Sequence, residues 1–449
     1  MMTILNGNDF HLIDKLAKKI VYLVIFPLSF SLEASPWLEA QDPFLRSSIV
    51  LLSDAGKISS PTGHYPLRWS LFGDELATDS VYLPEFVIVE INELKYSLSS
   101  AKLNRGNRAA KFVAANEQPI ISGFGAFVRD EWGSYLSYEY LDNDYAFRIT
   151  SGYSRYNEEN DIRWDNSYLS LNAGDWLLSI GNIDRWWGQG WQHNLVFGSY
   201  AKASPDLSVS YINQNDWLGI WTFESLLEKP NDAIFNHHSA TRVVAKPSKK
   251  VTLGVTYQAW FDDANINKGD EQIALDSKLT LPGISLFDSA FLYHSVYVEL
   301  ASTAYLSEVG AWLVGWTGSF NVGLHTVRVV LESQHTTDQH STSYWQASNA
   351  NVGIGVYPGS YKEASVNTYE MDESYSVAFY LQLRNDHKIS FSYQKSEIEQ
   401  QERSFTQTNY RLPAFAGMLH AGLSYSQLKA ETSPKENQTT FWTGYEFRF

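Results

Sequence analysis

Cysteine is absent from the 449 residues, so the chain has no disulfide, no thiolate nucleophile and no cysteine-ligated metal site. This composition is compatible with an oxidising compartment. Basic residues are also scarce, since 34 lysines and arginines stand against 50 acidic residues and give a net charge of −16. Nucleic-acid binding needs a basic surface that neutralises phosphates, so we expect no nucleic-acid partner.

Local catalytic and cofactor motifs are missing as well. The sequence has no GxSxG nucleophile elbow, no phosphate-binding loop, no dinucleotide fingerprint and no complete calcium loop. We therefore expect no cofactor and no enzyme activity. Beyond the first 34 residues, no apolar run reaches the roughly 20 residues that a membrane-spanning helix needs.

Apolar and aromatic residues are plentiful. They make up 44% and 15% of the chain, with 15 tryptophans, 27 tyrosines and 28 glycines. Proteins that are rich in β-structure and carry aromatic residues at a membrane interface use residues in this balance. The composition predicts a large β protein.

The first 34 residues have the layout of a secretory signal peptide. Lys15, Lys18 and Lys19 precede an apolar run over residues 20–30, and Ala34 closes the polar stretch that follows. The run of eleven residues is too short to span a bilayer as a helix. We expect cleavage after Ala34 and export from the cytoplasm.

Residues 35–112 are predicted to form a small helical bundle or plug in the periplasm. Asp42 supplies an N-cap and Pro43 a first-turn proline, and Gly56 stands where that helix should end. A second helix is predicted over residues 67–76. A third is predicted to begin near Pro84, because apolar residues then recur at helical spacing.

Residues 113–449 change to a period of two and are predicted to form an antiparallel transmembrane β-barrel of about 18 strands. Apolar and polar side chains alternate along each segment, so one face of the sheet is apolar. The polar face carries charged side chains among small ones, as the lumen of a membrane barrel does. We expect Arg148, Arg328, Arg384 and Arg448 to face inward, where they pair across the lumen with the predicted inward carboxylates, which are Glu139, Glu332 and Glu446.

The last segment ends on an aromatic residue. Phe441, Tyr445 and Phe449 alternate with polar or small residues in a strand that reaches the end of the chain. This pattern resembles the terminal signal by which bacterial outer-membrane barrels are assembled. Phe449 is the predicted assembly signal, with the barrel-assembly machinery as a partner and outer-membrane lipid around the barrel.

Several short stretches, in this order along the chain, resemble the capsule-assembly outer-membrane protein family (Wzi). The stretches are 43–47, 51–56, 65–69, 166–170 and 181–191. The resemblance implies an 18-stranded barrel in the outer membrane of a Gram-negative bacterium, with a helical bundle at its periplasmic end. It also implies a surface lectin that ties capsular or extracellular polysaccharide to the cell. Gln189 departs from the family pattern, which usually has proline there.

The stretch 181–191 is the candidate carbohydrate-binding site, with the residues Asp184, Arg185, Trp186, Trp187, Gln189 and Trp191. Tryptophan faces pack on sugar rings, and the polar side chains can hydrogen-bond hydroxyls or a uronic acid. The alternative is a tight turn at the membrane interface, with the tryptophans in the headgroup girdle and Asp184 paired with Arg185 in the lumen.

Three function classes remain open from the sequence. A binding protein predicts a blocked lumen, a porin predicts an open one, and an outer-membrane hydrolase predicts a suitably separated pair among acids such as Glu131, Asp165 and Asp184. The set His335, Asp338 and His340 lies in a predicted outer loop and lacks a further ligand, so we expect no metal. We expect a monomer, and the charge of −16 disfavours an anionic polymer at long range.

Overall fold

The computed structural model describes residues 36–77, 83–102, 107–121, 123–156, 158–198, 203–229, 237–261, 270–302, 306–323, 325–336, 371–383, 385–398, 401–430 and 436–449. The predicted signal peptide therefore lies outside the described residues. So do Arg384, Asp338 and His340, for which the predictions are not tested.

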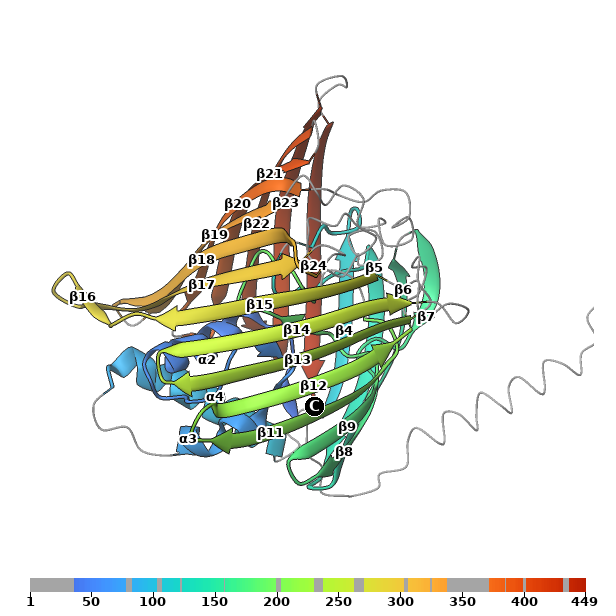
Figure 1. The fold of residues 1–449 in the computed structure, drawn as a ribbon. Helices are drawn as coiled ribbons and strands as arrows, with labels where there is room; N and C mark the ends of the chain where they lie inside the picture. The colour runs from blue at the N-terminus through green and yellow to red at the C-terminus, as the bar shows by residue number, and fades with distance from the viewer. Residues whose placement is uncertain are drawn as a thin grey trace, which may run out of the picture.

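The described strands form a closed antiparallel barrel of 18 strands, as predicted (Figure 1). The strands, in chain order, are β4 (Arg108–Ala115), β5 (Trp132–Leu141), β6 (Tyr145–Tyr156), β8 (Tyr168–Ala173), β9 (Trp176–Gly181), β11 (Asp206–Asn215), β12 (Gly219–Glu228), β13 (His237–Ser248), β14 (Val251–Phe261), β15 (Asp270–Thr280), β17 (Ala290–Ser302), β18 (Val309–Val322), β19 (His325–Thr336), β20 (Met371–Gln382), β21 (Lys388–Ile398), β22 (Gln401–Ala414), β23 (Gly417–Ala430) and β24 (Glu436–Arg448). Two short strands, β7 (Glu159–Arg163) and β16 (Ile284–Leu286), extend the pairing at the ends of β6 and β17. Closure comes from β24, which pairs with β4.

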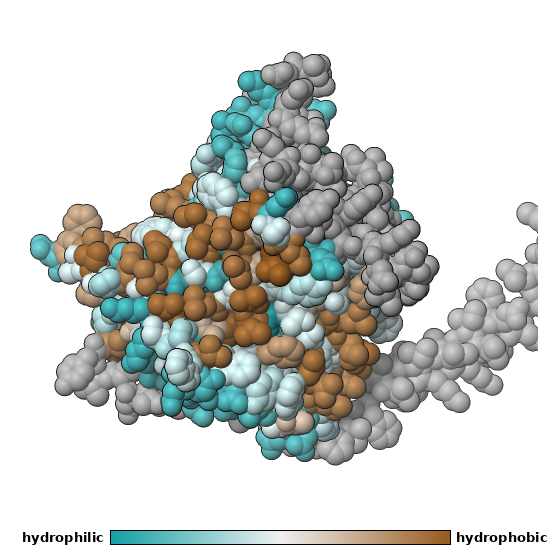
Figure 2. Space-filling view, viewed as in Figure 1, coloured by the Kyte–Doolittle hydropathy of each residue, from teal (hydrophilic) through white to brown (hydrophobic). Residues whose placement is uncertain are grey.

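The alternation of side chains has the predicted orientation. On β14, Leu253 and Val255 are exposed on the outer surface, whereas Thr252 and Thr256 are buried inside. The same holds on β24 for Phe441, which is exposed, and Trp442, which is buried. Apolar side chains gather over the middle of the wall and polar ones near its ends (Figure 2). Such an outer belt suits the hydrocarbon core of a bilayer.

The barrel begins earlier than predicted. Strand β4 starts at Arg108, whereas the sequence pattern predicts the boundary after residue 112. The first residues of β4 are needed for closure, because Ala109 and Ala110 pair with Arg448 and Phe447 of the last strand. The stretch before Phe112 contains adjacent alanines and has no clear alternation, so its strand character depends on partners far along the chain.

Two of the three predicted helices are confirmed. Helix α2 (Pro43–Asp54) starts at the Asp42 cap, whose carboxylate accepts from the backbone N–H of Phe44 and Leu45, and Gly56 follows its end with a φ of +73°. Helix α4 (Glu85–Lys102) buries the predicted apolar stripe, which consists of Val87, Ile91, Leu94 and Leu98. No helix among the described residues is long and apolar enough to cross a membrane.

The predicted helix over residues 67–76 is wrong. Instead, β3 (Leu67–Arg68) pairs with β1 (Trp37–Leu38), and the 3₁₀ turn η1 (Trp69–Leu71) and the short helix α3 (Gly73–Ala77) follow. The cross-strand partner at residues 37–38 competes with local helix formation, and the single-sequence pattern does not contain it.

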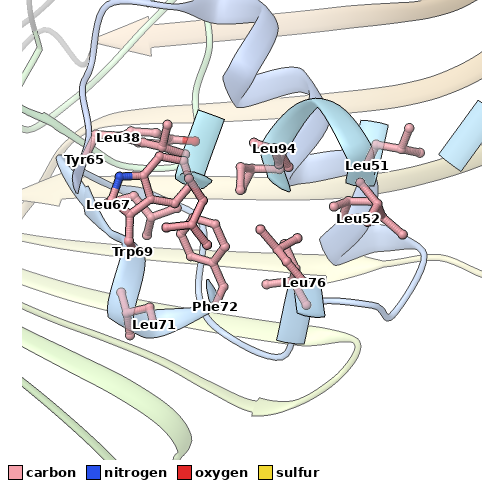
Figure 3. Packing of buried hydrophobic residues seen from close by; sticks show 14 of the residues in the cluster. Leu38, Leu51, Leu52, Tyr65, Leu67, Trp69, Leu71, Phe72, Leu76 and Leu94 are labelled. Atoms are coloured by element: carbon pink, nitrogen blue, oxygen red, sulfur yellow. The ribbon is translucent and has the colours of Figure 1, made fainter. Parts of the chain in front are cut away.

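The helical segment occupies one end of the barrel, where α2 packs against β17, β18 and β20 of the wall, and we call residues 37–77 and 83–102 the plug (Figure 1). Its apolar side chains form one core, much of which is drawn in Figure 3. On the wall, Arg328 of β19 donates to the Ser47 hydroxyl at 2.9 Å and to the Ser47 carbonyl at 2.8 Å. Helix α2 is thus fixed to the lumen surface by buried hydrogen bonds.

The two ends of the barrel differ in their connections. At one end, described turns of two or three residues join the strands, for example residues 216–218, 249–250 and 415–416. At the other end, the connections 116–131 and 182–205 are much longer. Barrels of the outer membrane have short turns on the periplasmic side and long loops outside. On this pattern, the short-turn end is expected to face the periplasm and the long-loop end the cell exterior.

Candidate functional site

The candidate stretch lies in the connection between β9 and β11, which folds into the lumen. We call residues 182–198 the lumen loop. Its short strand β10 (Trp186–Trp187) pairs with β2 (His64–Tyr65) of the plug, with Trp186 opposite Tyr65 and Trp187 opposite His64. The lumen loop and the plug therefore form one hydrogen-bonded unit inside the barrel.

Two buried carboxylates of the wall bind the backbone of the lumen loop. Glu332 accepts from the N–H groups of Trp191 at 2.5 Å, Gln192 at 2.8 Å and His193 at 2.9 Å. Glu299 accepts from Gly190 at 2.8 Å and from Gln189. Successive N–H groups that converge on an anion make a favourable site for it, so these bonds offset the cost of burying the charges.

Gln189 links the lumen loop to the wall through its backbone and its side chain. Its backbone N–H donates to Glu299, and a proline has no N–H to donate. Its side chain adds a second anchor, because Nε2 donates to Asp276 at 2.8 Å. Gln189 thus makes two bonds between the lumen loop and the wall.

Arg185 and Asp184 do not pair with each other, so that prediction is wrong. Arg185 donates twice to Asp206, at 2.8 and 2.9 Å, and once to Glu224 at 2.9 Å. Asp184 instead accepts from Arg129 at 3.0 Å and from the Gln41 side chain at 3.0 Å. Adjacent residues in an extended segment project to opposite sides, which separates the two charges.

His64 of the plug extends the Arg185 network. Its Nε2 lies 2.5 Å from Glu224, and its ring stacks on Trp187 with the centroids 5.3 Å apart. Burial lowers the pKa of His64, and Glu224 opposes this effect. The neutral ring is favoured, so the contact with Glu224 is a hydrogen bond between the plug and the wall.

The three tryptophans are all buried inside the barrel. Trp186 and Trp187 have no exposed surface and Trp191 has 1%, so the predicted position of one of them in the headgroup girdle is wrong. The Trp186 indole N–H donates to the Gly190 carbonyl at 2.8 Å. The rings pack against the plug. The residues next to the tryptophans in the sequence do not predict this burial.

Arg46 is a buried residue at the centre of these contacts that the sequence pattern did not single out. It lies on α2, is 2% exposed, and donates to the Gln189 carbonyl at 3.1 Å. Its guanidinium lies 4.4 Å from the ring centroids of both Trp191 and Phe124. Cation–π contacts of this kind are strong when they are desolvated. The sequence feature that could have indicated Arg46 is its charge within the largely apolar stretch 44–52.

Charged wall residues contact the plug and the lumen loop rather than one another across the lumen. Arg148 donates to Glu139 on the neighbouring strand at 2.6 Å and pairs with Glu39 of the plug. Glu332 binds the lumen loop, and Arg328 binds α2. The prediction of inward charges is confirmed for these residues, and the prediction of direct cross-lumen pairs between them is wrong because protein fills the space.

The six predicted sugar-binding residues are thus brought together, but none is more than 5% exposed. In this arrangement their rings and polar groups contact protein, and a polymer at the cell surface would not reach them. Their role in carbohydrate binding remains an untested prediction. Two of the three candidate acids form ion pairs with arginines, Asp184 with Arg129 at 3.0 Å and Glu131 with Arg155 at 2.9 Å.

Metal binding finds no support within the described ranges. His335 lies 3.5 Å from Glu373, and these ranges contain no group of three or more histidine, aspartate or glutamate side chains that could hold a metal ion.

The comparisons with known proteins agree with this architecture. Residues 101–262 match the family model of the capsule assembly protein Wzi. The resemblance noted in the sequence is confirmed by this match, which includes the whole lumen loop and the first strands of the barrel. No curated protein sequence matches the chain.

A solved structure extends the likeness to Wzi over almost the whole chain. The Escherichia coli outer-membrane protein Wzi, involved in group 1 capsule assembly and described as a carbohydrate-binding β-barrel, is 15% identical, with a TM-score of 0.75. The match covers 92% of this chain and 99% of that one, so the two share their fold.

Two other outer-membrane structures match more weakly. OpdK of Pseudomonas aeruginosa is 9% identical with a TM-score of 0.46, and OccAB3 of Acinetobacter baumannii is 11% identical with a TM-score of 0.47. Each match covers 76% of this chain and 98% of the other.

Proposed function

We propose that this chain is an outer-membrane β-barrel that binds and anchors capsular or exported polysaccharide at the cell surface. The observation that carries the proposal is a Wzi-like barrel whose lumen holds both a plug and an inward-folded loop. The likeness to Wzi supplies the ligand class, because that protein is described as carbohydrate-binding and involved in capsule assembly.

The packed lumen favours binding over diffusion. Wall residues from β12 to β19 that would line a channel are buried beneath the plug and the lumen loop, among them Glu224, Arg242 and Arg328. A porin needs an open aqueous path, and a constriction lined by these residues is not available here. The wall therefore serves as a scaffold that holds the two inserted segments.

The proposed setting is the outer membrane of a Gram-negative bacterium. The apolar outer belt suits lipid, the short turns suit the periplasmic side, and the plug lies toward that side. Phe449 is proposed to act as the signal read by the barrel-assembly machinery. We propose a monomer, because a closed barrel leaves no sheet edge that a second copy would have to cover.

We further propose that the protein binds its polymer without hydrolysing it. Among the described carboxylates, Asp184, Asp206 and Glu224 are held by arginines, and Glu299 and Glu332 by backbone N–H groups. Carboxylates that are hydrogen-bonded in this way are poor general acids, since a catalytic carboxyl group must reach the substrate directly.

The experiment that tests this function measures where the polymer is. A deletion strain should retain less surface polysaccharide and release more into the medium, and the full-length chain should restore retention. A variant altered at the exposed end of β24, Asn437→Ser, serves as the control for expression. Normal retention in the deletion strain would overturn the proposal.

Two further measurements separate the alternatives. Purified protein in a planar bilayer should give negligible conductance, whereas large and stable single-channel steps would favour a porin. Incubation with labelled polysaccharide should leave its chain length unchanged, and shortened products would favour a hydrolase.

A further inference from the structure

The plug fills the lumen unevenly. Lumen-facing side chains of β12 to β19 are buried beneath it, as for Glu224, Arg242 and Arg328. The corresponding side chains of β22 and β23, such as Asn409 and His420, remain partly exposed. A space is therefore left on one side of the barrel.

This space is a cavity of about 720 Å³ between the plug and the wall formed by β21 to β24, β5 and β6. We call it the side cavity. Sites for small organic ligands have volumes of roughly 300–1,000 Å³, so the side cavity is large enough for an oligosaccharide segment. Its lining includes exposed Tyr96 of α4 and the exposed turn residue Ala416, which place its opening at the short-turn end.

The positive charges that line the side cavity are neutralised by neighbouring carboxylates. The lining contains four cationic side chains, and each is paired with a carboxylate; the pairs are Arg411 with Asp42, Arg148 with Glu139, Lys388 with Glu93, and Arg448 with Glu446. An anionic ligand would have to compete with these carboxylates for a cation. A fully apolar ligand would cover charged groups without hydrogen-bonding them, which is costly.

The remaining lining combines flat rings with amides and hydroxyls. Phe127 and His420 stack with their centroids 3.6 Å apart and their planes within 4°, and both are partly exposed. Beside them lie Gln407, Asn409 and Ser390. Rings accept the apolar face of a sugar, while amide and hydroxyl groups both donate to and accept from its hydroxyls.

We propose that the side cavity is a binding site for a neutral oligosaccharide segment that enters from the short-turn end. This inference rests on the proposed function and adds a second location for the polymer, inside the barrel and away from the lumen loop. The His420 ring, which stacks on Phe127, provides the apolar platform, while Lys111 and His420 both contact the Phe127 ring. Asn409 provides a polar partner beside this platform, and its Nδ2 donates to the Ser390 hydroxyl at 3.1 Å.

The absence of cysteine makes a direct test possible, because any introduced cysteine is a unique label. Asn409→Cys places a thiol in the side cavity, and Asn437→Cys places one on the exposed end of β24 as the matched control. The purified proteins are treated with a maleimide in the presence of maltotriose, cellotriose or tri-galacturonate. Heat-modifiable gel mobility reports the folded barrel in each sample.

We expect a neutral trisaccharide at saturating concentration to slow labelling of Asn409→Cys at least about fivefold and to leave Asn437→Cys unchanged. Calorimetry then uses the neutral trisaccharide that protects Asn409→Cys more strongly. His420→Ala should weaken its binding roughly tenfold, and Asn437→Ser should not weaken it. Unchanged labelling with both neutral trisaccharides would overturn the inference. Protection by tri-galacturonate alone would overturn the assigned ligand class.

The retention assay keeps this inference distinct from the proposed function. If the deletion strain sheds polymer while no trisaccharide protects Asn409→Cys, the function stands and the side cavity is not its binding site. If a neutral trisaccharide protects Asn409→Cys while the deletion strain retains polymer normally, the site stands and the anchoring function fails.

Discussion

Glu332 illustrates how single residues of the wall determine the state of the lumen. It accepts three N–H groups of the lumen loop, and the Tyr297 hydroxyl donates to it at 2.6 Å. Hydrogen bonds to a charged group contribute more than those between neutral groups, and a donor left unsatisfied in a buried position is costly. One side chain therefore stabilises both the loop and its position.

The first prediction concerns this carboxylate. Glu332→Ala should lower the free energy of unfolding by about 3 kcal/mol, because several buried donors lose their acceptor. Glu332→Gln keeps the volume and one acceptor oxygen, so its loss should be smaller. Urea unfolding in detergent micelles, followed by tryptophan fluorescence, measures both. Glu402→Ala, on the partly exposed outer part of the wall, is the control and should change little. Equal stability of Glu332→Ala and the native protein would contradict this account.

The second prediction concerns pH. Burial alone would raise the pKa of Asp42, but Arg411 at 2.7 Å and nearby Lys388 hold it well below its usual range. The folded state then favours the ionised carboxylate. Its contribution to stability is present above about pH 4, the ordinary value for aspartate, and is lost as the pH falls further.

Asp42→Asn keeps an oxygen that can cap α2 but removes the charge. The variant should be less stable than the native protein at pH 7, and the difference should shrink between about pH 4 and pH 2. Thermal unfolding over this range measures it. A difference that stays constant down to pH 2 would show that the ion pair with Arg411 does not stabilise the plug.

Among the elements, the pairing of β10 with β2 is the link between the two inserted segments. Each strand has only two residues, and such a pair is not stable by itself in water. It persists here because Glu299, Glu332 and Arg185 attach the lumen loop to the wall. The wall therefore stabilises a short pairing that local sequence would not.

The third prediction tests this link. Replacing residues 186–195 with a glycine-serine linker of equal length removes the buried tryptophan rings and the side-chain anchors of Gln189 and His193. The backbone N–H groups of the linker are then no longer held against the wall carboxylates. We expect a folded barrel with measurable, fluctuating conductance in a planar bilayer, where the native protein gives almost none. Replacing residues 415–416, an exposed turn, with Gly-Ser is the control. A silent bilayer with the replaced loop would show that the plug alone closes the lumen.

At the scale of the whole molecule, the barrel closes between its first and last strands. The Phe449 N–H donates to the Arg108 carbonyl at 2.9 Å, and the Arg108 N–H donates to the Phe449 carbonyl at 3.2 Å. The Phe449 ring is exposed and stacks on Phe447, with the centroids 5.3 Å apart. The last residue thus lies at the seam and presents an aromatic ring outward.

The fourth prediction follows from this position. Removal of Phe449 should reduce the amount of barrel in the outer membrane several-fold, because it takes away the predicted assembly signal and the last pair of seam bonds. Membrane fractionation with heat-modifiable gel mobility measures the inserted protein. Phe449→Trp keeps an aromatic end and should insert normally. Normal insertion of the shortened chain would contradict the role of Phe449.

The sequence determined those features that depend on neighbouring residues. The period of two along β14 and β24 determined which face is apolar, because side chains alternate strictly in a strand. The Asp42 cap and Gly56 determined the ends of α2, because both act within one turn. Only the tertiary structure decided where residues 182–198 lie, because burial of Trp186 and Trp187 depends on the plug and on carboxylates more than 100 residues further along the chain. The helix predicted over residues 67–76 failed for the same reason, since the strand partner of Leu67 and Arg68 lies about 30 residues earlier in the sequence.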